Sequence, residues 1–280
     1  MGANPFRFMT ALWVTVGLFF ALLRGLEALP GVAGPGNLNW LRVHVLTIGT
    51  MTQMIFATLP GLVSRKLGTP NRPPGEAWLQ WALVNGGFVL VIAGIVGIDP
   101  WTATAGATLI FTAVWRLAAF VTGSYRAAGY RWREAMRFYV TAPLYLLVGI
   151  TMAVSLVFAW WAPGGRAGTL EAHVHANVWG FLALTVAGAL TDLFPVAAGR
   201  GLARPKWTGR IYWLLNLGAM ALVAGPWLNL HPVTVAGLLT YMTGSILLLT
   251  NLALTLAEGR SATPAALHMT LAYLWMVVPA

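Results

Sequence analysis

Histidine is the residue type in this chain best suited to cofactor chemistry, and three of the five histidines open apolar, helix-length segments. His44 opens one of them, and His173 and His175 open another, Glu171–Pro195, whose interior carries no charged side chain before Asp192. Ionisable groups at membrane depth are costly, so they are interpreted first as functional. Residues two apart on a helix point about 200° apart, so His173 and His175 are expected to face opposite sides and could each serve a different cofactor.

The composition predicts an integral membrane protein, because 58% of the 280 residues are hydrophobic and only 9% are charged, whereas soluble domains carry about 25% charged residues. The absence of cysteine excludes disulfides, cysteine-ligated zinc, iron–sulfur clusters and thiolate catalysis. A net charge of +10 would favour a nucleic-acid partner in a soluble protein. Basic loops that orient the chain explain this charge better, so membrane lipid is the expected surrounding and no nucleic-acid partner is predicted.

Eight apolar segments match the roughly 20 residues that a helix needs to cross a bilayer. They cover residues 8–24, 43–63, 77–98, 102–122, 137–161, 173–195, 208–230 and 233–256. A ninth apolar run begins near Pro264 and reaches Ala280, which is short for a complete span. The predicted fold is therefore all-α, a polytopic membrane bundle of 8–9 transmembrane helices.

Basic residues in the loops predict the orientation of the chain. With the N-terminus cytoplasmic, the outer side holds only Arg24, Arg42 and Arg166. The cytoplasmic side then holds Arg7, Arg65, Lys66, Arg72, Arg126, Arg131, Arg133, Arg137, Arg200, Arg204, Lys206, Arg210 and Arg260. This positive-inside pattern predicts a cytoplasmic N-terminus and places His44, His173 and His175 in the outer half of the membrane. The expected location is a prokaryotic cytoplasmic membrane. Arg116 falls inside a span, where snorkelling, structural pairing or an anionic cofactor group are the alternatives.

An internal repeat is indicated by matches at nearly one sequence shift. A shift of 131 residues places His44 on His175, Gly49 on Gly180 and Gly106 on Gly237. The matches predict two four-helix repeats, residues 1–130 and 131–261, followed by the start of a ninth helix at 262–280. Parallel repeats bring equivalent residues to one depth, so His44 and His175 are expected to face each other across one cofactor.

A bis-histidine haem b is the cofactor that these residues favour. Haem iron takes axial imidazoles, and His44 and His175 would supply one each. Small residues nearby, Gly49, Gly180, Ala187 and Gly188, would let a flat macrocycle lie between helices, although they also permit close helix packing. For His173 the alternatives are a second haem, a hydrogen bond in the headgroup zone, or the orientation of a loop.

Three further ionisable residues have structural interpretations. Glu171 is expected to be a capping charge at the N-terminus of the helix at 173–195, with a hydrogen bond to an imidazole or to a haem propionate network as the alternative. His231, directly before Pro232, and His268, in the ninth run, are expected to play structural roles.

The stretch HVH…LFP resembles the tenth helix of subunit I in the haem-copper oxidase and nitric oxide reductase superfamily. The shared pattern is His-x-His, a glycine shortly after and an aromatic–Pro pair about twenty residues on, which here are His173, His175, Gly180 and Phe194-Pro195. The resemblance implies that His173 holds a high-spin haem and His175 a low-spin haem. It also maps the second low-spin ligand onto His44 in RVHVLTIGTMTQ.

The resemblance further implies an electron-donor protein and oxidase-type subunits as partners. The chain departs from the family in having no histidine between residues 45 and 172, so the copper-site pattern is absent and no copper is expected. It is also about half the length expected of the family. We therefore expect a reduced or divergent member that transfers electrons, with a second haem at His173 binding NO or O₂, and not a complete oxygen-reducing centre.

Two other functions fit the same sequence. A transporter built from two repeats would line a path with mid-membrane polar residues, for which Thr50, Gln53, Asn85 and Asn216 are available. A haem-handling or assembly protein would also use duplicated four-helix units, but with histidines on more helices than this chain has.

Overall fold

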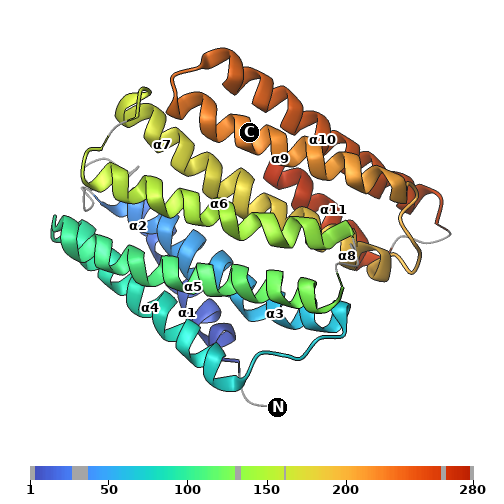
Figure 1. The fold of residues 1–280 in the computed structure, drawn as a ribbon, viewed down its shortest axis with the longest axis horizontal. Helices are drawn as coiled ribbons and strands as arrows, with labels where there is room; N and C mark the ends of the chain where they lie inside the picture. Colours follow the sequence, from blue (N-terminus) through green and yellow to red (C-terminus); the bar gives the residue numbers. More distant parts are fainter. Residues whose placement is uncertain (1–3, 27–36, 130–133, 161, 260–262, 278–280) are drawn as a thin grey trace. The chain divides into compact units, whose positions relative to one another are not determined.

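The computed structural model describes residues 4–26, 37–129, 134–160, 162–259 and 263–277, and the regular structure in these ranges is entirely helical. The chain divides into two compact units, Met1–Gly129 and Tyr130–Ala280. Figure 1 traces unit 1 from blue to green and unit 2 from light green to red. Several predicted features lie outside the described residues: Arg131, Arg133, Arg260, the expected repeat boundary at 130/131, and both ends of the segment 262–280 that holds the expected ninth helix.

The described residues of unit 1 form four rods of helix, and the second rod contains a π-helical stretch. Helix α1 packs against the second rod, α4 packs along α5, and the second rod also contacts α5. The second rod is continuous through a π-helical stretch, η1, in which hydrogen bonds run from i to i+5. The elements are α1 (Pro5–Leu26), α2 (Leu38–His44), η1 (Val45–Thr52), α3 (Gln53–Leu67), α4 (Pro74–Val96) and α5 (Pro100–Ala127).

Unit 2 has the same kind of second rod and an additional helix. Helix α9 packs along α10 and contacts α7, while α6 packs against the whole α7–η2–α8 rod, and α11 lies on α8 and α10. The elements are α6 (Glu134–Val157), α7 (Gly165–His175), η2 (Ala176–Ala183), α8 (Leu184–Ala197), η3 (Pro205–Trp207), α9 (Thr208–Trp227), α10 (His231–Ala257) and α11 (Pro264–Val277).

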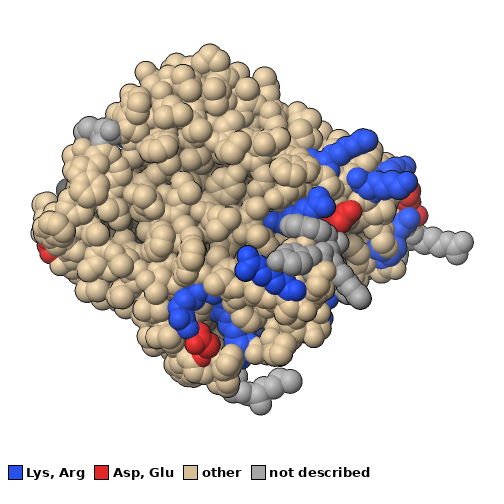
Figure 2. Space-filling model, in the orientation of Figure 1, with Lys and Arg blue, Asp and Glu red and all other residues tan. Residues whose placement is uncertain are grey.

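Within the described residues, seven helical segments are long and apolar enough to cross a membrane: Pro5–Leu26, Leu38–Leu67, Pro74–Val96, Pro100–Ala127, Glu134–Val157, Gly165–Ala197 and His231–Ala257. The expected span at 208–230 corresponds to α9, which is not among the seven. The expected ninth helix corresponds to α11, which has 14 residues. Large apolar side chains such as Phe8, Trp115 and Trp275 are exposed. On the face shown in Figure 2 the surface is mostly uncharged, and Lys and Arg gather in a few groups.

The helix that carries His173 and His175 begins earlier than the sequence predicted. Its first residue is Gly165, so the histidines lie two to three turns inside it and do not open it. The prediction that Glu171 caps the N-terminus is therefore wrong, because the N-cap position is Gly164 and Glu171 lies in the second turn. The reason is that GRAGTLEA is too polar for the apolar pattern but contains no proline, so the helix continues through it despite its two glycines.

Positions 131 residues apart have similar local geometry in the two units. Gly68 follows the end of α3 and Gly199 follows the end of α8, and both have a positive φ, 68° and 64°. Ile98, between α4 and α5, and Asn229, between α9 and α10, have φ of 57° and 58°. A left-handed residue costs a non-glycine side chain energy. The same strained position is therefore used at the same place in both units.

Candidate functional site

His44 and His175 occupy the same place in their respective rods. His44 is the last residue of α2 and is followed by the π-helix Val45–Thr52; His175 is the last residue of α7 and is followed by the π-helix Ala176–Ala183. Each π-helix has eight residues. π-Helices are rare, usually single-turn and frequently found at functional sites. The two histidines predicted as cofactor ligands therefore border the two most unusual backbone segments of the described chain.

The ring of His44 is held by its own helix. Its Nδ1 lies 2.9 Å from the carbonyl oxygen of Trp40, one turn earlier. The imidazole also stacks on the indole of Trp40, with ring centroids 4.1 Å apart and planes 20° apart. Because a carbonyl oxygen only accepts, Nδ1 must be the donor, which assigns the tautomer that carries its lone pair on Nε2.

The ring of His175 is held by a different helix. Its Nδ1 lies 2.7 Å from the carbonyl oxygen of Leu222 in α9 and donates to it. In an α-helix that carbonyl would accept from the residue four positions later, which here is Pro226. Proline has no N–H, so it leaves the Leu222 carbonyl without its usual helical donor. The imidazole of His175 supplies that hydrogen bond.

Two glycines bring α7 close enough to α9 for this contact. A Cβ added at Gly164 or Gly168 would collide with the carbonyl oxygen of Pro226, and the N–H of Gly164 donates to the carbonyl of Trp227 at 2.9 Å. Close backbone approach of this kind requires residues without side chains. The polar GRAG segment therefore positions His175 against the end of α9.

His173 faces a third element, α6. Its Nδ1 lies 2.8 Å from the carbonyl oxygen of Gly149, whereas His175 contacts α9. The amide nitrogen of Asn177 lies 3.2 Å from Nδ1 and 3.4 Å from Nε2 of His173 and donates to its backbone carbonyl. The structure thus places the two histidines against different helices, as their spacing indicated. Sequence reasoning missed Asn177, although its i+4 spacing from His173 was a usable signal.

The three imidazoles share one feature that suits them to bind iron. Each directs Nδ1 at a backbone carbonyl, which fixes the ring and raises its basicity, and this is the arrangement of most metal-bound histidines. The donor set fits haem, which needs only one or two protein ligands. Among the described residues there is no group of three or more His, Cys, Asp or Glu that could hold a bare metal ion.

The remaining histidines are not brought to this arrangement. His231 is the exposed first residue of α10. His268 in α11 is exposed and hydrogen-bonds the carbonyl of Pro264 at 2.7 Å. His268 thus has the same i−4 bond as His44, but neither a π-helix nor a stacked indole is found beside it in the described structure.

Four polar residues proposed for a transport path make hydrogen bonds inside their own units. The buried Gln53 donates to Asn85 at 2.8 Å, Trp13 donates to the same oxygen at 3.1 Å, and Asn85 donates to Trp81 at 2.9 Å. The Nδ2 of Asn216 donates to the backbone carbonyl of Tyr212. The hydroxyl of Thr50 donates to the backbone carbonyl of Val45. Gln53 and Asn85 therefore tie the second rod of unit 1 to α4.

The part of the chain that the structure describes defines a class: helical throughout its regular structure, with seven candidate membrane-spanning helices and with carbonyl-anchored histidines beside π-helices. Compared with models of known protein families the chain matches none, and no curated protein matches it. Any functional proposal therefore rests on the chain's own residues.

Proposed function

We propose that this chain is an integral membrane haem b protein of the haem-copper oxidase subunit I type, in which His44 and His175 are axial ligands of haem iron. Bound haem would supply one-electron transfer. The two histidines hold their rings in place through carbonyl hydrogen bonds and present Nε2 as the ligating atom. No copper is part of the proposal.

The observation that carries the proposal is the local equivalence of His44 and His175. Both precede an eight-residue π-helix and both anchor Nδ1 on a carbonyl at less than 3 Å. A structural histidine needs a hydrogen bond, but it does not need a rare backbone form repeated at the same place. A ligand that must be aimed accurately explains both features.

We also propose that the two units arose as four-helix repeats and that the chain has 8–9 transmembrane helices with a cytoplasmic N-terminus. Support comes from close helix approaches at equivalent positions. A Cβ at Gly87 would lie 2.7 Å from the carbonyl oxygen of Gly106, and one at Gly218 would lie 2.6 Å from the N of Tyr241. Helix α9, which packs along α10 as α4 does along α5, would then be the eighth span.

His173 is proposed as the ligand of a second haem that binds NO or O₂. It lies on the other side of α7 from His175, against α6, and its ring is also anchored through Nδ1. Asn177 places an amide donor beside the ring at 3.2 Å. An electron-donor protein and oxidase-type subunits are the proposed partners, in a prokaryotic cytoplasmic membrane.

The test compares optical spectra of alanine variants at His44, His175 and His268, expressed with ample haem. His268→Ala is the matched control, because it removes an imidazole with the same i−4 carbonyl bond. His44→Ala and His175→Ala are expected to lose the six-coordinate b-type spectrum, while His268→Ala keeps it. A CO-sensitive spectrum that survives in the first two and is lost in His173→Ala supports the second haem. Unchanged spectra in both His44→Ala and His175→Ala would contradict the proposal.

The transporter alternative has weaker support. It needs polar groups that can contact a solute, whereas Gln53 and Asn85 are buried and hydrogen-bonded to one another. The haem-handling alternative needs histidines on more helices than the described chain provides. Neither gains an observation comparable to the paired π-helices.

A further inference from the structure

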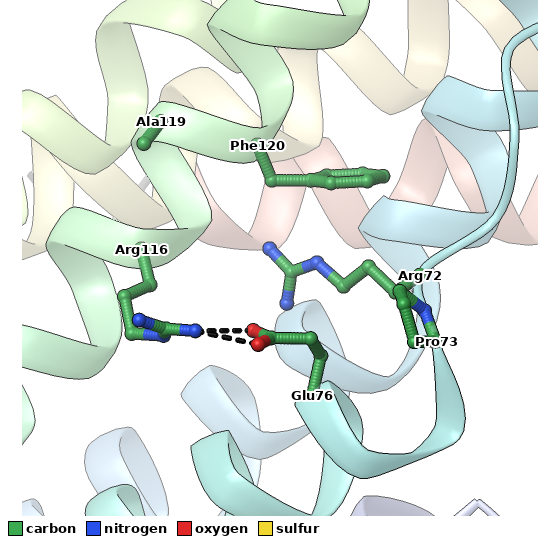
Figure 3. A pocket seen from close by; sticks show the side chains of 6 residues that line it. All are labelled: Arg72, Pro73, Glu76, Arg116, Ala119 and Phe120. Atoms are coloured by element: carbon green, nitrogen blue, oxygen red, sulfur yellow. Dashed lines mark hydrogen bonds and ion pairs between the residues drawn. The ribbon is translucent and has the colours of Figure 1, made fainter.

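A pocket of about 330 Å³ at one end of unit 1 brings together two arginines and one glutamate. It is lined by Arg72, Pro73, Glu76, Arg116, Ala119 and Phe120. Arg72 lies in the connection between α3 and α4, Glu76 in the first turn of α4, and Arg116 on α5. Figure 3 shows the guanidinium of Arg72 between the ring of Phe120 and the side chain of Glu76.

The pocket lies far from His44, the histidine of unit 1. His44 is near the start of the rod Leu38–Leu67, and Arg72 follows its far end. At about 1.5 Å per residue the helical distance from His44 to the end of that rod is roughly 35 Å. The pocket is therefore distinct from the proposed haem ligand His44, and phosphate binding there does not depend on haem.

The charges in the pocket do not balance. Arg116 pairs with Glu76 through one guanidinium nitrogen, 2.7 and 2.5 Å from the two carboxylate oxygens. Arg72 has no carboxylate of its own there: it donates to the amide oxygen of Gln80 and its guanidinium carbon lies 4.4 Å from the centre of the Phe120 ring. Burial lowers the pKa of Arg72 to about 10, so the side chain is still a cation near pH 7. One half-buried positive charge, that of Arg72, therefore remains.

Two donors in the pocket lack a hydrogen-bond partner. Within the described structure, the Nη2 of Arg72 and the Nε of Arg116 are buried and make no hydrogen bond. A buried donor without a partner is costly, and more so when it belongs to a charged group. Both atoms belong to guanidinium groups that line one pocket. An oxyanion placed there would satisfy the donors and the surplus charge together.

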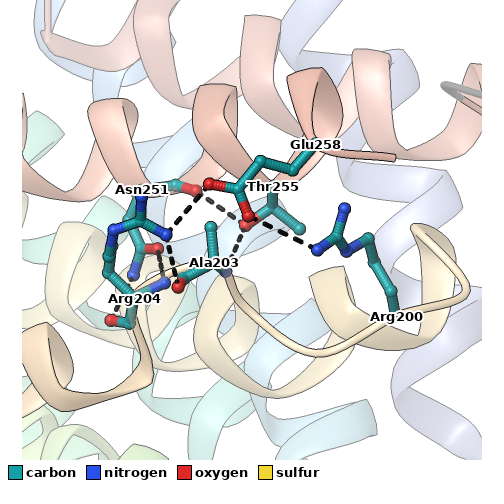
Figure 4. Close-up of polar contacts among 6 residues, drawn as sticks. All are labelled: Arg200, Ala203, Arg204, Asn251, Thr255 and Glu258. Carbon is teal, nitrogen blue, oxygen red and sulfur yellow. Dashed lines mark hydrogen bonds and ion pairs between the residues drawn. The ribbon is translucent and has the colours of Figure 1, made fainter. Parts of the chain in front are cut away.

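The corresponding end of unit 2 is built differently. At a shift of 131 residues, Arg72, Glu76 and Arg116 correspond to Ala203, Trp207 and Leu247. In unit 2 the connection after α8 is bonded directly to α10 (Figure 4). The backbone N–H of Ala203 donates to the hydroxyl of Thr255, and that of Arg204 donates to the side-chain oxygen of Asn251. The carboxylate of Glu258 pairs with Arg204 at 2.9 Å and with Arg200 at 3.5 Å. Among the described residues, buried guanidinium nitrogens without a hydrogen-bond partner occur in unit 1 alone.

We propose that the pocket of Arg72 and Arg116 binds a phosphate group, as the headgroup of an anionic phospholipid or as free phosphate. Arginine donors arranged around a pocket suit phosphate oxygens. Basic pockets between membrane helices bind anionic lipid headgroups on the cytoplasmic side. The pocket lies at the end of unit 1 that carries Arg65, Lys66 and Arg126, the end predicted to be cytoplasmic.

The experiment measures phosphate-group binding by the full chain in two arms. In the first, native mass spectrometry counts phosphatidylglycerol and phosphatidylcholine retained from mixed micelles. In the second, calorimetry titrates inorganic phosphate into the chain in phosphatidylcholine nanodiscs. Arg72→Gln is expected to weaken binding about tenfold, the loss of one charge-assisted hydrogen bond. The arm in which binding depends on Arg72 identifies the source of the phosphate.

Matched variants separate the pocket from general charge. Arg65→Gln removes an exposed arginine at the same end and is expected to leave binding unchanged. Glu76→Gln removes the pocket's own anion and is expected to strengthen binding, a gain that a misfolded variant would not give. Arg116→Leu, the residue found at the corresponding position of unit 2, is expected to weaken it. Equal effects of Arg65→Gln and Arg72→Gln, weaker binding in Glu76→Gln, or no binding in either arm would overturn the proposal.

Discussion

His175 donates from Nδ1 to the carbonyl oxygen of Leu222 across 2.7 Å, and this carbonyl lies four residues before a proline. The imidazole thus replaces a helical N–H that Pro226 does not have. A sequence feature that normally weakens a helix here provides a strong acceptor for a proposed iron ligand. The orientation and basicity of His175 therefore depend on Pro226, although the hydrogen bond of His175 is made to Leu222.

Pro226→Ala is predicted to raise the midpoint potential of the haem-loaded protein. The new N–H would compete for the Leu222 carbonyl, weaken the bond from His175 and make the imidazole less basic, which favours the reduced iron. The rise should be on the order of tens of millivolts, where about 59 mV equals a tenfold change for one electron. Spectroscopic redox titration measures it. Pro60→Ala, in α3, is the control, and equal potentials in Pro226→Ala and the wild type would contradict this role.

Gly87→Ala is predicted to destabilise unit 1, and its neighbour Gly86→Ala is predicted not to. A Cβ at Gly87 would lie 2.7 Å from the carbonyl oxygen of Gly106, whereas one at Gly86 meets nothing within 4 Å. Overpacking costs about 1–3 kcal/mol, while alanine at an open helical position gains about 0.4–1 kcal/mol. Denaturant unfolding in detergent compares the two. Equal stabilities would show that α4 and α5 do not approach this closely.

Asn85→Leu is predicted to cost more stability than Gln53→Leu. Asn85 accepts from both Gln53 and Trp13, so its loss leaves two donors without their partner. Each unpaired buried group costs about 1–3 kcal/mol. Gln53→Leu leaves Asn85 bonded to Trp13 and Trp81 and introduces the residue found at the corresponding position of unit 2, Leu184. A larger loss for Gln53→Leu in thermal unfolding would argue against this network.

Asp99 is predicted to stabilise the fold at neutral pH and to lose this contribution in acid. Its pKa is lowered below 3.8, chiefly because the hydroxyl of Thr102 donates to it, helped by the N–H groups of Trp101 and Thr102. A carboxylate with a lowered pKa stabilises the fold above its ordinary pKa, and this contribution is lost as the pH falls through the folded value. The Tm difference between wild type and Asp99→Asn should therefore be constant from pH 7 to about 5 and shrink below about 3.8.

Thr102→Val is the companion variant for this prediction. It removes the hydroxyl of Thr102, the largest cause of the lowered pKa, and should move the pKa of Asp99 back toward its ordinary value. The stabilisation by Asp99 should then begin to fall at a higher pH. A gap between wild type and Asp99→Asn that does not change between pH 3 and 7 would show that the carboxylate does not cap α5 in this way.

Much of the helical architecture could be predicted from the sequence, because apolar segments of span length are strong signals. The helix starts were less predictable. The polar segment after Gly164 belongs to α7, and Glu171 is not a cap, because helix formation does not end where hydropathy falls. The pairing of Arg116, left open among alternatives, is with Glu76. Glu76 lies just before the expected span at 77–98, and the structure places it in the first turn of α4.

The histidines were visible in the sequence, but their anchoring was not. Hydrophobic periodicity does not distinguish a π-helix from an α-helix over eight residues, so neither η1 nor η2 was predicted. The bond from His175 to Leu222 joins residues 47 positions apart and depends on how α7 and α9 pack. Pro226 and Asn177 are plain in the sequence, yet only the tertiary contacts give them a role.

The most direct test of the haem proposal is the reduced-minus-oxidised optical spectrum of the purified wild-type chain, expressed with ample haem and quantified for haem per chain. The account predicts a Soret band and a sharp reduced α-band of six-coordinate b-type haem, with at least one haem per chain. A preparation that is folded, as judged by circular dichroism, but has no Soret band would contradict it and would favour the transporter alternative.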